Sequence, residues 1–338
     1  MTAKKYVRRT AAALVVPALL MTAACGSDAG KNTVSGKPGE KPKVTLDKDA
    51  KPPKKVSVET LAKGKGKPAA KGDFVRFDVL GKMTGDKKGK GQDLISTWDA
   101  KSAAAPKPDG KGAHTQMVAK LGSPQQALPA KVTDALVGKK AGSRVKVEGT
   151  AKSLIGPQAV QMGMKPNSGL IWVLDLRSSS KVDSKATVKG DQKPVRSGLP
   201  DAKAHKKKAA TITVPKGEKP PKKLEQQTLV KGKGPKVENG EGLVAQYTGV
   251  KWEDGKKFDS SYDQGGPTPF QLGTKSVIPG WDKALVGKHV GDRVLLVAPP
   301  KEAYGSKQAK KQAQQQGGRK NPLEKNTLVF LVDIVGKV

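Results

Sequence analysis

Apolar and polar positions alternate in the second half of the chain as they do in half-buried β-strands. Three segments alternate in this way or run continuously apolar, and they are rich in β-branched residues: GLVAQYTGVKW, DRVLLVAPP and NTLVFLVDIVGKV. The first is followed by the turn sequence EDGK and by KFDSS, which predicts a hairpin. PGWDKALVG predicts a short helix, with Pro279 in its first turn and Gly287 just past its end. One short helix against several antiparallel strands indicates an α+β domain.

The chain carries this pattern twice. ALVGKKAGSRVKV at 135–147 matches ALVGKHVGDRVLL at 284–296. Further along, LIWVLDL at 170–176 corresponds to LVFLVDI at 328–334. Features that recur in the same order indicate a repeated structural unit. We therefore predict two versions of one domain.

Composition predicts polar segments around these domains. Only 35% of the residues are hydrophobic, whereas glycine and proline are abundant. Residues 178–221 contain ten lysines and no aromatic residue, and residues 25–52 have the same character. Such segments bury too little apolar surface to offset the entropy lost on ordering. We expect a disordered tether at 25–52, a first domain at 53–177, a disordered Lys-rich linker at 178–221 and a second domain at 222–338.

The amino terminus has the layout of an export signal. Residues 1–24 combine basic residues with an apolar run shorter than the ~20 residues that a membrane-spanning helix needs. TAAC at 22–25 resembles the lipobox of bacterial lipoproteins, in which the cysteine is diacylated. The resemblance implies a signal peptide at 1–24, lipidation of Cys25 and a lipid-anchored chain on the extracytoplasmic face of the cell membrane. A secreted protein cut nearby is the alternative, and Arg8-Arg9 leaves a twin-arginine route open beside general secretion.

The formal charge of +34 changes this picture little. Only eight of the 64 basic residues are arginine and only 4% of the chain is aromatic, so a nucleic-acid partner is not expected. The lysines suit solvated spacers, and anionic cell-envelope polymers are a further candidate partner. One cysteine allows no intramolecular disulfide, and three scattered histidines form no metal-binding pattern.

Five short strings in the second copy carry a resemblance to a known family. They are YTG at 247–249, FDSS at 258–261, VIPGW at 277–281, AYG at 303–305 and TLVF at 327–330. Together they resemble the FKBP-type peptidyl-prolyl cis-trans isomerases. The resemblance implies two FKBP-like domains, each an antiparallel half-barrel sheet wrapped around a short helix. It also implies non-covalent catalysis without cofactor or metal, acting on X-Pro-containing polypeptides.

The same resemblance implies a set of site residues. As catalytic residues it implies Tyr247, Phe258, Asp259, Trp281, Tyr304 and Phe330, and as substrate-binding residues Phe270, Val277 and Ile278. Trp281 would form the floor of an apolar pocket, and Asp259 its one acid. The Tyr304 hydroxyl and the Ile278 backbone N–H would hold substrate carbonyls.

The second copy departs from the family at three places. Thr268 stands where an aromatic residue is common, and Gln264 where a basic residue often pairs with the aspartate. The loop from Tyr304 to Thr327 is long and positive, so substrates with acidic flanks are one expectation.

The first copy keeps the scaffold but not the site residues. Val132, Ile155 and Trp172 align with Trp281, Tyr304 and Phe330. We therefore expect a degenerate domain with weak or no activity, in which Trp98 and Trp172 could rebuild an apolar cavity.

The leading hypothesis is a monomeric, membrane-anchored extracytoplasmic prolyl isomerase that assists the folding of exported proteins. The alternative is a non-catalytic lipoprotein that binds proline-containing or unfolded segments as a chaperone or adaptor. A third hypothesis is an envelope-associating protein in which the isomerase fold is incidental.

Overall fold

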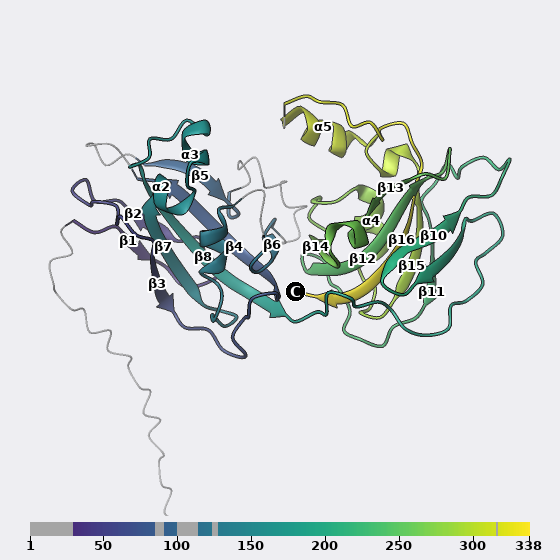
Figure 1. The fold of residues 1–338 in the computed structure, drawn as a ribbon, viewed down its shortest axis with the longest axis horizontal. Coiled ribbons are helices and arrows are strands. Elements are labelled where there is room, and N and C mark those ends of the chain that lie inside the picture. The colour runs from purple at the N-terminus through teal and green to yellow at the C-terminus, as the bar shows by residue number, and fades with distance from the viewer. Residues whose placement is uncertain (1–29, 85–90, 100–113, 124–127, 316) are drawn as a thin grey trace, which may run out of the picture.

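The computed structural model describes residues 30–84, 91–99, 114–123, 128–315 and 317–338. The predicted signal peptide and Cys25 lie outside these residues. Figure 1 shows two lobes side by side, each built on an antiparallel sheet. No helix in the described part of the chain is both long and apolar enough to cross a membrane.

The first lobe contains a six-stranded sheet in the order β3-β7-β8-β4-β5, with β6 paired to β4. Its strands are β3 (Ser57–Ala62), β4 (Phe74–Met83), β5 (Gln92–Ser96), β6 (Met117–Lys120), β7 (Arg144–Thr150) and β8 (Gly169–Ser180). Its short helices are α1 (Ala130–Asp134), α2 (Ala151–Leu154) and α3 (Gln158–Gln161).

The second lobe repeats this topology in the order β11-β15-β16-β12-β13, with β14 paired to β12. Its strands are β11 (Glu225–Val230), β12 (Gly242–Lys251), β13 (Lys257–Ser260), β14 (Thr268–Gln271), β15 (Arg293–Ala298) and β16 (Leu328–Lys337). Its helices are α4 (Pro279–Leu285), α5 (Lys307–Gln315) and the 3₁₀ turns η1 (Ser261–Gln264) and η2 (Pro300–Glu302). The prediction of two copies of one antiparallel, mostly β fold with short helices is confirmed.

The short helix α4 is placed by its own sequence. Pro279 fixes the backbone of the first turn, and Gly287 adopts a φ of +85° just beyond the end. Trp281, Ala284 and Leu285 are buried against the inner face of the sheet. One helical stripe and one sheet face therefore form the core of this domain.

A buried ion pair recurs at the same place in both sheets. Arg144 contacts Asp175 at 2.7 Å between β7 and β8, and Arg293 contacts Asp333 at 2.6 Å between β15 and β16. Each pair is bidentate and also bonds backbone of a preceding segment, which satisfies the buried charges. These pairs dock the polar segments that precede each domain.

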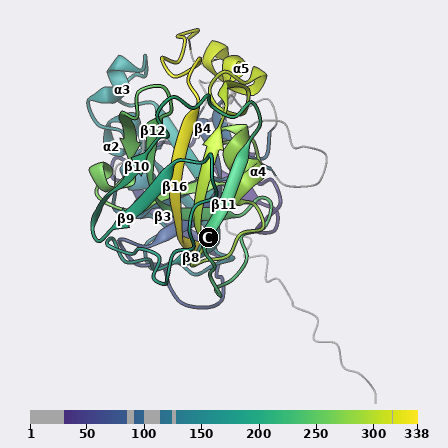
Figure 2. The same ribbon diagram turned by 90° about the vertical axis from the view of Figure 1, so that its right-hand side faces the viewer.

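The prediction that residues 178–221 form a disordered linker is wrong. Strands β9 (Asp201–His205) and β10 (Lys208–Thr213) form a hairpin on the outer face of the second sheet, opposite α4 (Figure 2). That face is apolar, and the buried side chains of Ala202 and Ile212 cover it while the lysines stay exposed. Arg293 donates to the Val188 carbonyl at 3.0 Å, which pins the segment.

The predicted disorder of the tether is likewise wrong for its described residues, 30–52. Strands β1 (Thr33–Ser35) and β2 (Lys43–Thr45) pair as a short hairpin (Figure 1). Arg144 donates to the carbonyls of Gly36 at 2.8 Å and Glu40 at 2.6 Å. The hairpin is thus held by the buried ion pair of the first sheet.

The two lobes pack against each other. Phe74 of the first lobe and Val244 and Val338 of the second are buried in one shared apolar cluster. Strands β6 and β14 lie against each other at this contact. The first domain therefore adjoins the edge of the second sheet.

Candidate active site

Trp281 lies at the centre of an aromatic cluster in the second domain. Its ring centroid is 5.4 Å from that of Tyr247, 5.0 Å from Phe270 and 5.5 Å from Phe330. The rings meet at interplanar angles of 68° to 87°, the edge-to-face arrangement that aromatic pairs favour. Trp281, Tyr247 and Phe330 are buried and form a solid floor.

Gly249 on β12 allows two of these rings to meet. A Cβ at this position would lie 2.7 Å from Cζ of Phe258 and 3.1 Å from Cε1 of Phe330. Phe258 and Phe330 pack edge to face across the glycine, with centroids 5.6 Å apart. Because Gly249 has no side chain, the Phe258 and Phe330 rings can meet at this end of the site.

The rim of the site is apolar and half-exposed. Its residues pack against the core but keep part of their surface in solvent: Phe258, Phe270, Val277, Ile278 and Tyr304. The structure thus brings together all nine predicted site residues. We call them the aromatic site.

Asp259 is held by two donors. The Tyr247 hydroxyl donates to one carboxylate oxygen at 2.6 Å, and the Gln264 amide to the other at 2.7 Å. Burial, and then the hydrogen bond to Asp259, raise the pKa of Tyr247 well above its ordinary value, so Tyr247 remains a donor. Gln264 stands where the family often has a basic residue, and its neutral amide still donates a hydrogen bond to the Asp259 carboxylate.

Two predicted donors remain free. The Tyr304 hydroxyl and the Ile278 backbone N–H have no hydrogen-bond partner among the described residues. Burial and the nearby Asp259 raise the pKa of Tyr304, which keeps its hydroxyl protonated. Both groups can therefore donate to carbonyl oxygens of a bound chain.

Sequence reasoning missed the side chains that hold the rim loop at residues 273–277. Asp282 accepts the backbone N–H groups of Gly273 at 2.7 Å and Lys275 at 3.1 Å. From the other side, the Gln308 amide of α5 donates to the carbonyls of Lys275 at 3.0 Å and Val277 at 2.9 Å. The position of Asp282 in the first turn of the predicted helix was the one sequence feature that could have indicated its role. No local sequence pattern indicates the role of Gln308.

In the described part of the first domain, apolar side chains stand at the equivalent positions. Trp172 pairs with Gly81 as Phe330 pairs with Gly249, and Ile95 stands opposite Gly81 where Asp259 stands opposite Gly249. Val132 and Trp172 are buried in the core, and Ile155 packs against it. The suggestion that Trp98 joins a rebuilt cavity is wrong, because its indole N–H donates to the Gly39 carbonyl of the β1–β2 hairpin at 3.4 Å.

An aromatic floor, an apolar rim and two free donors form a site that can enclose an apolar group and donate hydrogen bonds to acceptors beside it. The family model of the FKBP-type peptidyl-prolyl cis-trans isomerases matches residues 234–335. A curated "FK506-binding protein" from Streptomyces anulatus is 38% identical over 124 residues, which are 37% of this chain and 93% of that protein. The chain belongs to the FKBP-type peptidyl-prolyl cis-trans isomerases.

Other relatives and solved structures match a similar share of the chain. "FK506-binding protein 2" of Yarrowia lipolytica is 42% identical over 100 residues, 30% of this chain and 62% of that protein. A solved structure described as a putative isomerase FKBP12 from Mycobacterium tuberculosis is 36% identical, covers 36% of this chain and 88% of its own, and has a TM-score of 0.26. The family match at residues 234–335 lies within the second domain.

Proposed function

We propose that the aromatic site isomerises X-Pro bonds of exported polypeptides on the outer face of the cytoplasmic membrane. The observation that carries this proposal is the buried Trp281 ring, which three other rings surround at interplanar angles of 68° to 87° and beside which two donors remain free. A proline ring is compact and apolar, and it would pack on the indole in the place of water.

The chemistry asked of the site is modest. Resonance keeps an X-Pro amide planar and imposes a rotation barrier of about 18–20 kcal/mol. The planar form carries more charge on its oxygen than the twisted form, and water stabilises that charge. A site that replaces water by aromatic surface therefore favours the twisted transition state.

The polar groups have separate roles in this proposal. Tyr304 and Ile278 hold substrate carbonyls on either side of the proline, which fixes the segment while the bond turns. Asp259, with Tyr247 and Gln264, forms a fixed carboxylate at the wall that orients the Tyr247 ring. The bond rotates without a covalent intermediate.

The cellular location rests on the amino-terminal sequence. Cleavage before Cys25 and attachment of two acyl chains would anchor the protein stably, because each buried CH₂ contributes about 0.8 kcal/mol. The exposed lysines of this chain would then lie near anionic lipids and wall polymers, which attract them. Clients would be chains that emerge unfolded from the export machinery.

Exchange of an X-Pro peptide, followed by NMR with the full chain, tests the catalytic proposal. Trp281→Leu and Asp259→Val should each slow exchange, because they remove the floor and the fixed carboxylate. Trp252→Leu is the matched control, since Trp252 is equally buried in this domain but on the opposite face of the sheet. Unchanged exchange in both site variants would overturn the site assignment.

The anchoring proposal needs its own experiment. Cells that express the chain are labelled with a fatty acid, and the protein is recovered from the membrane fraction. Label and membrane association should both be lost in Cys25→Ser. A Cys25→Ser chain that remains in the membrane would contradict the lipid anchor and leave the isomerase proposal intact.

A further inference from the structure

Strand β14 faces the aromatic site on one side and the first domain on the other. Phe270 belongs to the rim of the site, whereas its neighbour Gln271 is buried at the contact between the domains. The Gln271 side-chain oxygen accepts the backbone N–H of Gln116 at 2.7 Å. Its amide nitrogen donates to the carbonyls of His114 at 3.1 Å and Gly240 at 2.9 Å. Gln271 therefore ties the rim strand to residues 114–116 of the first domain.

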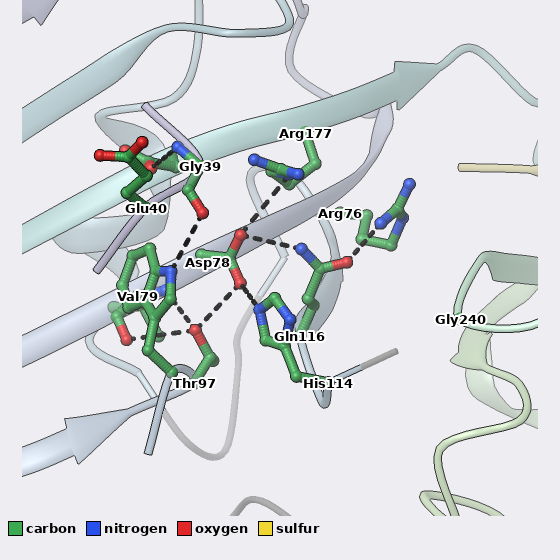
Figure 3. A network of polar contacts seen from close by, with 12 residues as sticks. Gly39, Glu40, Arg76, Asp78, Val79, Thr97, His114, Gln116, Arg177 and Gly240 are labelled. Carbon is green, nitrogen blue, oxygen red and sulfur yellow. Dashed lines mark hydrogen bonds and ion pairs between the residues drawn. The ribbon is translucent and has the colours of Figure 1, made fainter. Parts of the chain in front are cut away.

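A buried carboxylate holds those residues in place. Asp78 is fully buried on β4, and Figure 3 shows His114, Gln116, Thr97 and Arg177 around it. His114 Nε2 lies 2.5 Å and Gln116 Nε2 2.8 Å from its oxygens. The Thr97 hydroxyl donates at 3.1 Å, and Arg177 Nε lies 3.6 Å away. We call this group the Asp78 network.

The Asp78 network is particular to the first domain. The register of the sheets places Gln246, a neutral residue, at the equivalent position of the second domain. A buried carboxylate is costly unless it is fully hydrogen-bonded, so Asp78 depends on its partners. Two of these partners belong to the segment that contacts Gln271.

A second connection lies beside the first. Arg76 donates to the Val338 carbonyl at 3.1 Å and also contacts the side-chain oxygen of Gln116. Phe74, two residues before Arg76, is fully buried in the apolar cluster shared with Val244 and Val338. Polar and apolar contacts together make this a fixed junction rather than a loose one.

Strand β14 needs such support. It has four residues and pairs with β12 alone in its own sheet. We infer that the first domain positions the wall of the isomerase site, with Gln271 as the positioning residue for Phe270. The inference rests on the proposed function of that site, and it gives the degenerate copy a role that requires no activity of its own.

The test uses the full chain with two variants, Gln271→Ala and Asp78→Asn. Gln271→Ala removes the hydrogen bonds between β14 and residues 114–116. Asp78→Asn weakens the contacts that hold His114 and Gln116 in place. Both should raise KM for an X-Pro peptide by about fivefold and leave kcat within about twofold, because the substrate wall moves and the folded fraction does not. Thr150→Ala is the control, since it removes the helix cap of α2 in the first domain without touching β6.

A spectroscopic readout makes the result independent of activity. Phe270 lies 5.0 Å from the Trp281 ring, so a displaced Phe270 should shift the Trp281 indole N–H resonance in both variants and not in Thr150→Ala. If both variants keep the wild-type resonance and KM, or lose only kcat, the inference is overturned. If the wild type fails to accelerate exchange, the proposed function fails, and the indole resonance alone decides the inference.

Discussion

The Tyr247 hydroxyl lies 2.6 Å from a carboxylate oxygen of Asp259, so the floor of the aromatic site and its one acid act as a unit. This pairing explains why a carboxylate can lie at an apolar wall. It also places a tyrosine, rather than a phenylalanine, among the rings that surround Trp281.

Tyr247→Phe should keep the ring packing and lose the hydrogen bond. Because the bond is made to a charged, half-buried group, we expect a loss of about 1 to 2 kcal/mol in the free energy of unfolding. Denaturant unfolding measures this loss, and NMR exchange should show slower isomerisation. Tyr262→Phe, on the outer face beside the β9–β10 hairpin, should leave exchange unchanged. Equal exchange rates in Tyr247→Phe and wild type would remove Asp259 from the mechanism.

Asp282 should make stability depend on pH in an unusual direction. Burial raises its pKa from 3.8 to about 6, despite the N–H groups of Gly273 and Lys275. Between these values the folded protein binds more protons than the unfolded chain, so the Asp282 contribution to stability falls as the pH rises. The unfolding free energy of the wild type minus that of Asp282→Asn should therefore decrease from pH 4 to 6 and then level off.

Asp254→Asn provides the control for that measurement. Lys251 and the backbone N–H of Lys256 hold the pKa of Asp254 below 3.8, so its contribution is complete above that pH. The corresponding difference should be flat from pH 4 to 6. A flat difference for Asp282→Asn as well would show that burial does not control this carboxyl group.

The sequence was informative where local pattern and packing agree. Apolar and β-branched residues predicted β12 and β16, and Pro279 with Gly287 predicted α4, because these elements are buried in the core of the domain. Eight of the nine site residues lie in the five short strings around those elements, and Phe270 was implied by the family resemblance. The structure brings them together around Trp281.

The hairpins could not be predicted from composition. Lysines dominate residues 178–221, yet only Ala202, Ile212 and a few apolar neighbours decide the structure, because they cover an apolar sheet face. In TITVP at 211–215, polar and apolar residues alternate as in a β-strand, but the high charge of the surrounding segment favoured a prediction of disorder. Likewise, Gln271 and the Asp78 network lie at the contact between the domains. Gln271 and Gln116 are 155 residues apart in the sequence, and no local pattern predicts a hydrogen bond between them.

Gly249→Ala should distort the aromatic site. The new methyl group would lie 2.7 Å from Phe258 and 3.1 Å from Phe330, so one ring must move. Overpacking of this kind costs about 1 to 3 kcal/mol. We expect slower exchange from a domain that still folds, measured by NMR exchange beside thermal unfolding. Gly81→Ala creates the same clash against Trp172 in the first domain and should leave exchange near wild type.

The β9–β10 hairpin should resist proteolysis despite its lysines. Residues 178–221 contain ten lysines, and trypsin would cut this segment within minutes if it were disordered. The hairpin within it is docked through Ile212 and exposes its backbone only when it opens. Ile212→Ala removes a buried side chain, should cost about 2 kcal/mol or more locally, and should speed cleavage between residues 201 and 213. Thr213→Ala alters an exposed position on the same strand and serves as the control. Rapid cleavage of the wild type in this region would show that the hairpin is not docked.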